Sequence, residues 1–276
     1  MNVPLQYKII NGIKCFSPEV ANSYDDYPAG GFDLTDKSGE SSFWVRSRNR
    51  LFKRIVLKHL VVSGKTKLLE IGCGTGGFIQ QIAGNENLQI TGSEIYLQGL
   101  LYAQRKIPGV EFIQFDITQG TIGDEFDVIV AFDVIEHIEN DNEAISNISK
   151  MLNKQGSLII TVPQHMFLWG TLDEIVKHKR RYSRRELVTR LQENGFEISY
   201  CTSFLFVLFP LMMISRLFDR GRKQGQNENV ALEERVKFST ALNWVFDRFM
   251  RIDEFLIRLG VSLPFGGTLV VVATKR

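Results

Sequence analysis

The sequence predicts an α/β fold built on a mostly parallel sheet. Between residues 67 and 163, apolar strand-like segments alternate with helix-like segments, the pattern of β-α-β units. The segment FDVIVAFD, residues 126–133, is apolar on both faces, as a central parallel strand should be. The glycine-rich stretch LLEIGCGTGGF, residues 68–78, joins the first strand to the first helix of this series. These three observations favour one α/β sheet with a ligand site beside the glycine turn.

The amino-acid composition limits which classes of protein the chain can belong to. The chain has 276 residues, 44% of them hydrophobic and 23% charged, which is ordinary for a globular protein with a proper core. A net charge of +2 is too small to argue for a nucleic-acid partner. Cys15, Cys73 and Cys201 are odd in number and form no C-x-x-C pair, so neither a disulfide framework nor a zinc ribbon is indicated. A reducing compartment follows, and MNVPLQYKIINGIK lacks the apolar core of a secretory signal.

The N-terminal part divides into an extension and a helix. Residues 1–41 are irregular, except that YKIINGIKCF predicts a hairpin turning at Asn11-Gly12, where positive φ angles are needed. From residue 42 to about residue 62, apolar residues recur at helical spacing. This helix also carries basic residues, namely Arg46, Arg48, Arg50, Lys53 and Arg54.

The central elements follow in order. The expected strands are residues 67–72, 88–95, 110–116, 126–133 and 156–163, and the expected helices are 77–83, 97–107 and 140–153. A polar segment from Gln164 to Arg181 then leads into a helix over 183–195, where Ser183 and Glu186 have the spacing of a capping box. A sixth strand covers 196–204, and GTLVVVAT near the C-terminus is the last strand.

Residues 205–260 interrupt the pattern before the last strand. The run FLFVLFPLMMI, Phe204 to Ile214, is too short to cross a bilayer, since crossing needs about 20 residues. It is core, the lining of a substrate tunnel, or a segment that dips into a membrane surface. Residues 234–260 show helical periodicity, and the polar stretch GRKQGQNENVA between the two parts predicts a mobile loop. The insertion is therefore a lid, a membrane-facing element or a dimer element.

The glycine turn has two nucleotide interpretations. Gly72, Gly74 and Gly77 spell G-x-G-x-x-G, which brings backbone N–H groups close to a bound nucleotide. Glu94 ends the second strand, 22 residues after Gly72, and can bind the ribose hydroxyls of any adenosine. Glu70 discriminates between a dinucleotide and a cationic nucleoside ligand, because a carboxylate beside the turn repels a pyrophosphate and attracts a cation. S-adenosylmethionine (SAM) carries an amino group and a sulfonium and has no phosphate.

With Asp116 at the end of the third strand, suited to the adenine amino group, the chain resembles the class I SAM-dependent methyltransferases over about residues 67–163. The resemblance implies a Rossmann-like seven-stranded sheet, mostly parallel with one antiparallel C-terminal strand. The SAM-binding domain would comprise residues 42–204 and 261–276. The implied cofactor-binding residues are Glu70, Gly72, Cys73, Gly74, Gly76, Glu94, Ile95, Asp116, Ile117, Asp133, Trp44 and Arg46. S-adenosylhomocysteine would be the product, and a Rossmann-like domain with another ligand is the alternative.

The segment DVIEH after the fourth strand resembles that of ubiquinone-biosynthesis O-methyltransferases. By that resemblance Asp133, Glu136 and His137 line the cleft, and His137 is either the general base or packs beside the cofactor. A histidine with a pKa near neutrality suits the deprotonation of a hydroxyl acceptor. His165 and His178 are the other candidate bases. The same three cleft residues are also a candidate Mg²⁺ site, because oxygen ligands suit that ion.

The segment TLDEIVKHKRRYS resembles the D-x(4)-H-x-R-R-Y motif of a bacterial methyltransferase subgroup often encoded with cell-surface glycan genes. It predicts acceptor binding by Asp173, Arg181 and Tyr182, since an arginine pair suits a phosphate or carboxylate; a solvated charge run is the alternative. FWVRSRNR resembles the entry helix of that subgroup. Trp44 and Arg46 would close over the cofactor or acceptor, unless the helix is simply amphipathic.

The sequence thus predicts SAM-dependent O-methylation by in-line transfer. The acceptor would be small or lipid-linked, of surface-glycan or isoprenoid and quinone type. We expect a cytoplasmic protein without a nucleic-acid partner. Peripheral contact with the inner face of the membrane and formation of a homodimer are further expectations. The alternatives are an NAD(P)-dependent oxidoreductase and a non-catalytic SAM-binding partner subunit.

Overall fold

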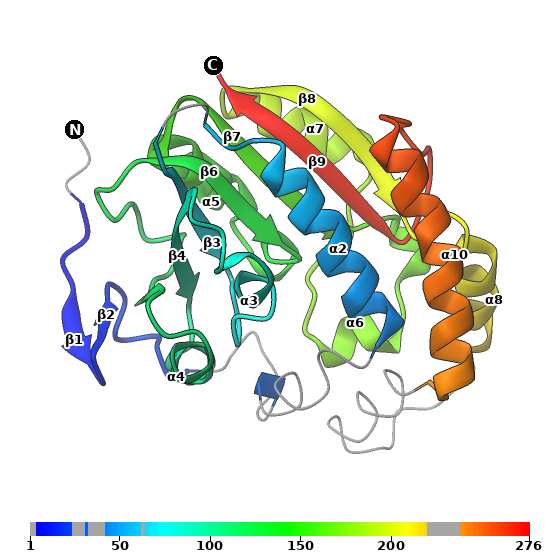
Figure 1. The fold of residues 1–276 in the computed structure, drawn as a ribbon, viewed down its shortest axis with the longest axis horizontal. Helices are drawn as coiled ribbons and strands as arrows, with labels where there is room; N and C mark the ends of the chain where they lie inside the picture. Colours follow the sequence, from blue (N-terminus) through cyan, green and yellow to red (C-terminus); the bar gives the residue numbers. More distant parts are fainter. Residues whose placement is uncertain (1–3, 24–30, 33–41, 62–63, 220–237) are drawn as a thin grey trace.

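The chain folds around one nine-stranded sheet with helices on both faces (Figure 1). The computed structural model describes residues 4–23, 31–32, 42–61, 64–219 and 238–276. The strands run in the order β1-β2-β5-β4-β3-β6-β7-β9-β8. Their bounds are β1 Lys8–Ile10, β2 Ile13–Cys15, β3 Thr66–Ile71, β4 Leu88–Glu94, β5 Glu111–Gln114, β6 Phe126–Phe132, β7 Leu152–Pro163, β8 Phe196–Phe204 and β9 Thr268–Lys275.

The helices cover the sheet because successive strand residues point to opposite faces. Leu68 faces a cluster that includes residues of α2, α3 and α4, whereas its neighbour Leu69 faces a cluster built with α5 and α7. The helices are α2 Phe43–Leu57, α3 Ile79–Ile82, α4 Leu97–Lys106, α5 Asp141–Met151, α6 Thr171–Ile175, α7 Arg184–Glu193, α8 Phe209–Asp219 and α10 Thr240–Arg258, with short 3₁₀ turns η1 Ile135–His137 and η2 Met166–Leu168.

The topology confirms the predicted α/β class and the reversed last strand. From β5 to β7 the neighbouring strands pair in parallel, and β9 pairs antiparallel with both β7 and β8. The predicted number of strands, seven, is two too few. The N-terminal hairpin turns at Asn11 and Gly12 as expected, with φ angles of 52° and 79°, and β2 then pairs in parallel with β5. This pairing covers the backbone groups that β5 would otherwise leave open at the sheet edge.

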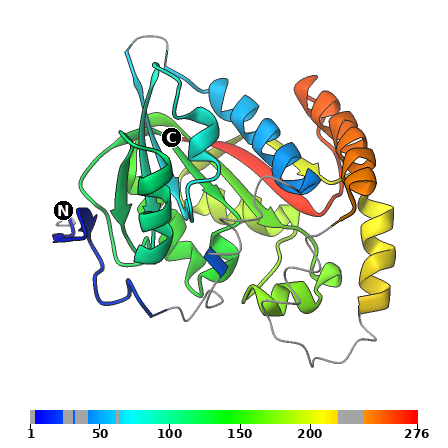
Figure 2. The ribbon, with the colours of Figure 1, turned by 60° about the horizontal axis from the view of Figure 1, so that its bottom comes forward.

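The insertion before β9 contributes α8 and α10, which lie at one end of the molecule in both views (Figures 1 and 2). Helix α10 packs against α2: the N–H of Phe43 donates to Asn243, and Arg50 forms ion pairs of 2.6 Å with Glu254 and 2.9 Å with Asp247. The loop predicted at residues 221–231 lies outside the described residues. Within the described part of the chain, no helix is long and apolar enough to cross a membrane.

Asp253 connects α10 to the turn that follows β8. Its side chain is fully buried, and its carboxylate accepts hydrogen bonds from the N–H groups of Phe206 at 2.6 Å and Val207 at 3.1 Å. The carboxylate thus satisfies two backbone donors at the point where the chain leaves the sheet.

We expect Asp253→Ala to lower the free energy of unfolding by about 2 to 3 kcal/mol, because it leaves both N–H groups without an acceptor. Urea unfolding measures this loss. Arg251→Ala is the matched control on the same helix. Arg251 is half exposed and forms an ion pair with Asp247, four residues away, so its replacement should cost about 0.5 kcal/mol or less. Equal losses for the two variants would contradict this role of Asp253.

Candidate active site

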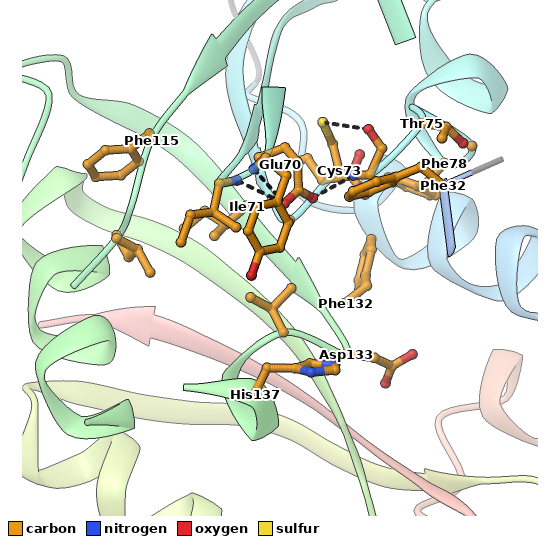
Figure 3. Close-up of a pocket in the computed structure, with 18 of the residues that line it drawn as sticks. Phe32, Glu70, Ile71, Cys73, Thr75, Phe78, Phe115, Phe132, Asp133 and His137 are labelled. Atoms are coloured by element: carbon orange, nitrogen blue, oxygen red, sulfur yellow. Dashed lines mark hydrogen bonds between the residues drawn. The ribbon is translucent and has the colours of Figure 1, made fainter. Parts of the chain in front are cut away.

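A cavity of about 820 Å³ opens at the carboxyl ends of the parallel strands (Figure 3). Its volume is within the range of small-molecule sites, and its position is where open α/β sheets bind ligands. Its walls come from the turn after β3, the ends of β4, β5 and β6, and the inner side of α2. Ten predicted site residues line it: Glu70, Gly72, Cys73, Gly74, Glu94, Ile95, Asp116, Ile117, Asp133 and His137.

The glycine turn follows β3 in a conformation that most residues avoid. Gly72 has a φ of +70°, and a Cβ there would lie 2.5 Å from a methyl group of Val134. Gly76 has a φ of +77°, and its Cβ would lie 2.8 Å from Ile107. Gly76 is therefore needed for packing against α4 and does not line the cavity. Cys73 does line it, but burial raises the pKa of its thiol, so it is not a thiolate nucleophile.

Glu70 places a buried carboxylate at the cavity wall. The residue is 4% exposed, and among the described residues its Oε2 has no hydrogen-bond partner. Burial raises the pKa of Glu70 to about 8; the charge of Arg48 opposes the shift and that of Glu94 adds to it. A buried carboxylate without a donor gains most from a ligand that brings positive charge or N–H groups. The site therefore fits the ammonium end of SAM better than a pyrophosphate.

Glu94 and Asp116 lie at or just beyond the carboxyl ends of the next two strands along the chain, β4 and β5. The Glu94 carboxylate accepts from the N–H groups of Gly74 at 3.0 Å and Ile95 at 2.8 Å, so it ties the glycine turn to β4. Burial raises its pKa, while these hydrogen bonds act in the opposite direction. Asp116 uses one oxygen to accept from the N–H and hydroxyl of Thr118. Both carboxylates are thus fixed before any ligand binds.

Asp133 and Arg48 both line the cavity and form an ion pair with each other. Asp133 follows β6 with a φ of +57°, a strained backbone for a residue with a side chain. Its carboxylate accepts from Arg48 of α2 at 2.7 Å and from the hydroxyl of Thr161 at 3.0 Å. Arg48 was not among the site residues predicted from the sequence. The available signal was helical spacing, because Val45, Arg48 and Asn49 are i, i+3 and i+4 on one side of α2 and all line the cavity.

Trp44 and Arg46 do not line the cavity. Two residues apart on a helix, they point about 200° away from each other, so they cannot share one ligand-facing side. The Trp44 ring stacks on Phe204, with 5.7 Å between centroids, and Arg46 lies 3.9 Å from Asp247 of α10. Both side chains contribute to the packing of α2 against its neighbours.

His137, Glu136 and His178 form a cluster beside the cavity. His137 lines it, and the ring of His178 packs edge-on against His137 with 4.8 Å between centroids. Glu136 is fully buried and lies 3.7 Å from His178 Nε2, and burial raises its pKa well above the ordinary value. In Figure 3, Asp133 and His137 lie together, away from the glycine turn and its Cys73.

The donor set does not fit the Mg²⁺ considered from the sequence. One ligand atom each from Glu136, His137 and His178 lies within 4.8 Å of the others, but two of these atoms are imidazole nitrogens. Mg²⁺ prefers oxygen ligands, and the Asp133 carboxylate that could supply them is bound to Arg48. The predicted Mg²⁺ site is therefore not supported by the structure.

The predicted acceptor-binding residues have their partners inside the protein. Asp173 is fully buried and accepts from Arg181 at 2.8 and 3.0 Å and from His178 Nδ1 at 2.9 Å. Burial alone would raise the pKa of Asp173, but the bonds from His178 and Arg181 lower it below its usual value. Tyr182 is also buried and donates to Asp141. Asp173, Arg181 and Tyr182 do not line the cavity; Asp173 instead holds His178 next to His137.

His165 follows β7 but lies outside the cavity lining. Its φ is +66°, and its ring stacks on Phe167 with 4.9 Å between centroids. Burial lowers the pKa of His165, and the nearby Arg181 lowers it further, so the ring is neutral at pH 7. Of the three candidate bases, only His137 lines the cavity.

Comparison with known proteins agrees with this geometry. The family model described as "Methyltransferase domain" matches residues 39–200, more than half of the chain. A ubiquinone biosynthesis O-methyltransferase of Rickettsia typhi is 24% identical over 193 residues, covering 63% of this chain and 78% of that one. A probable SAM-dependent methyltransferase of Mycolicibacterium smegmatis is 24% identical over 162 residues, covering 58% and 61% of the two chains.

Among solved structures, the cyclase SpnF matches over 99% of both chains with a TM-score of 0.60 and 18% identity, a likeness of fold. The match to the family model agrees with the strand order and with the glycine turn, and together they identify the family of this chain. The chain belongs to the class I SAM-dependent methyltransferases.

Proposed function

We propose that the protein transfers the methyl group of SAM to an oxygen atom of a small or lipid-linked acceptor. The observation that carries the proposal is a single cavity with the buried Glu70 carboxylate at the glycine turn and His137 beside Asp133. One end suits a cation and the other offers a base. Alignment of acceptor and methyl group in such an enclosed site accounts for most of the catalysis expected in an in-line displacement.

The residues that would hold SAM lie at or near the carboxyl ends of successive parallel strands. Glu70 and the glycine turn suit its methionine end, Glu94 the ribose hydroxyls and Asp116 the adenine amino group. When bound, SAM supplies an electrophilic methyl group on a sulfonium. Asp133, held by Arg48 and Thr161, keeps its carboxylate fixed at the wall between the cofactor residues and His137.

His137 is the proposed general base. A hydroxyl acceptor loses its proton as the methyl group arrives, and an imidazole in the cavity can accept that proton at Nδ1 or Nε2. His178 packs on His137, and Asp173 fixes His178 through a 2.9 Å hydrogen bond. The D-x(4)-H-x-R-R-Y segment is then a positioning network, which differs from the acceptor-binding role we first expected of Asp173, Arg181 and Tyr182.

The relative from Rickettsia typhi supports an oxygen acceptor of quinone type, at low identity. SpnF, named a cyclase, has the same fold, so the fold by itself does not fix the reaction. A SAM-binding protein without methyl transfer, such as a partner subunit, is therefore the second candidate. An NAD(P)-dependent oxidoreductase is disfavoured, because Glu70 would face the pyrophosphate.

The test of the function is methyl transfer from labelled SAM into extracts separated into lipid and aqueous phases. We expect label in one phase, dependent on the protein. Tight binding of S-adenosylhomocysteine with no labelled product in either phase would favour the non-catalytic candidate instead.

Glu70 should make SAM binding depend on pH. Because burial raises its pKa to about 8, a cationic ligand must displace a proton below that pH. We expect the affinity for SAM to rise between about pH 6 and pH 7.5, by up to tenfold per pH unit. Glu70→Gln should bind SAM more weakly at pH 7.5 and lose this rise. Calorimetric titration with SAM at about pH 6 and pH 7.5 measures the affinity of both proteins. If the affinity of the variant rises with pH as much as that of the wild type, another group titrates.

His137→Ala should lower kcat by about a hundredfold to ten-thousandfold, the contribution of a positioned base. The dissociation constant of S-adenosylhomocysteine should stay within about threefold, since Glu70, Glu94 and Asp116 are untouched. His59→Ala is the control, because His59 lies near Ser157, outside the cavity lining. If turnover survives in His137→Ala, His137 is not the base.

A further inference from the structure

Helix α10 carries apolar side chains on two sides: Met250 and Ile257 are buried against the protein, and a second set is exposed. Its inner face carries the acidic residues of the helix, and each is bound: Asp247 and Glu254 to Arg50, and Asp253 to backbone N–H groups. Its outer face, which we define as Leu242, Val245, Phe249, Ile252, Phe255 and Leu259, consists of apolar side chains that are each 37% to 63% exposed. A helix that packs only on the protein would turn these side chains inward and leave the acids in water.

Further large apolar side chains are exposed on segments at the same end of the molecule. Leu211 and Ile214 of α8 are 48% and 51% exposed, and Phe265 in the loop before β9 is 40% exposed. Helices α8 and α10 lie at the same end of the molecule in Figures 1 and 2. Monomeric proteins seldom leave so many large apolar side chains together in water, so a surface of this kind indicates a partner.

The charges beside the outer face identify the partner. Arg248, Arg251 and Arg258 are exposed on α10, and Trp244, which is 60% exposed, lies under Arg248 with 5.1 Å between the guanidinium carbon and the ring centroid. Apolar, tryptophan and arginine side chains without exposed carboxylates are the composition of helices that lie in the surface of anionic membranes. Pairing with a second copy of the same face would bring like-charged arginine rows together.

We propose that the outer face of α10 binds the surface of an anionic lipid bilayer. The exposed apolar side chains enter the boundary between headgroups and acyl chains, and the arginines contact lipid phosphates. Arg50 of α2 forms an ion pair with Glu254 of α10, and Arg48 of the same helix lines the cavity, so α2 connects the proposed membrane-binding helix to the candidate active site. The membrane then delivers a lipid-linked acceptor, and in that respect the inference rests on the proposed function.

The test is sedimentation of the full chain with vesicles of phosphatidylcholine alone and of phosphatidylcholine with phosphatidylglycerol. We expect binding to the mixed vesicles, weakened by salt. Ile252→Ser with Phe255→Ser should reduce the partition coefficient at least about tenfold through lost apolar burial. Arg248→Glu with Arg258→Glu should reduce it about as much through the reversed charge.

Ile9→Ser is the matched control, since Ile9 is 61% exposed on β1, at the opposite end of the molecule in Figure 1. It should bind like the wild type. Absence of wild-type binding, or binding by both double variants that is as strong as that of the wild type, would overturn the proposal. So would a wild-type dimer in sedimentation velocity that Ile252→Ser with Phe255→Ser dissociates while vesicles are not bound. S-adenosylhomocysteine binding, measured in parallel, separates these failures from a failure of the proposed function.

Discussion

The burial of one carboxylate, Glu70, at the end of the first central strand is the constraint on which the site depends. Burial raises the pKa of Glu70, and among the described residues one oxygen of its carboxylate has no hydrogen-bond partner. The other carboxylates of the cavity have hydrogen-bond donors within the protein: Glu94 accepts from backbone N–H groups, and Asp133 accepts from Arg48. We therefore expect Glu70 to be the cofactor-site carboxylate that responds most strongly to a cationic ligand, which would favour SAM over a dinucleotide.

Much of the fold follows from local sequence patterns. The alternation of apolar strands and amphipathic helices predicts the parallel core, and Ser183 with Glu186 forms the expected capping box. The N-terminal hairpin was predicted, but its addition to the edge of the sheet could not be predicted in the same way. Asn11-Gly12 fixes the turn, but pairing of β2 with β5 joins residues about a hundred positions apart, and no local pattern specifies an edge-to-edge contact of that kind.

The site was predictable where it depends on strand ends, and less so where it depends on side-chain partners. Carboxyl ends of parallel strands meet at one edge, so Glu70, Glu94 and Asp116 could be placed together from sequence. The orientation of α2, which brings Arg48 and not Arg46 to the cavity, is set by packing on α10, some 200 residues away. The charged run containing Arg181 looked like a ligand surface because its acidic partner, Asp173, becomes buried only when the segment folds.

The central claim is that the cavity selects a cationic, phosphate-free cofactor. Calorimetric titration of the wild-type protein with S-adenosylhomocysteine and, separately, with NADH tests it most directly. The predicted result is saturable binding of S-adenosylhomocysteine with proton release near pH 7, as Glu70 ionises, and no binding of NADH. Binding of NADH as tight as that of S-adenosylhomocysteine would contradict the claim.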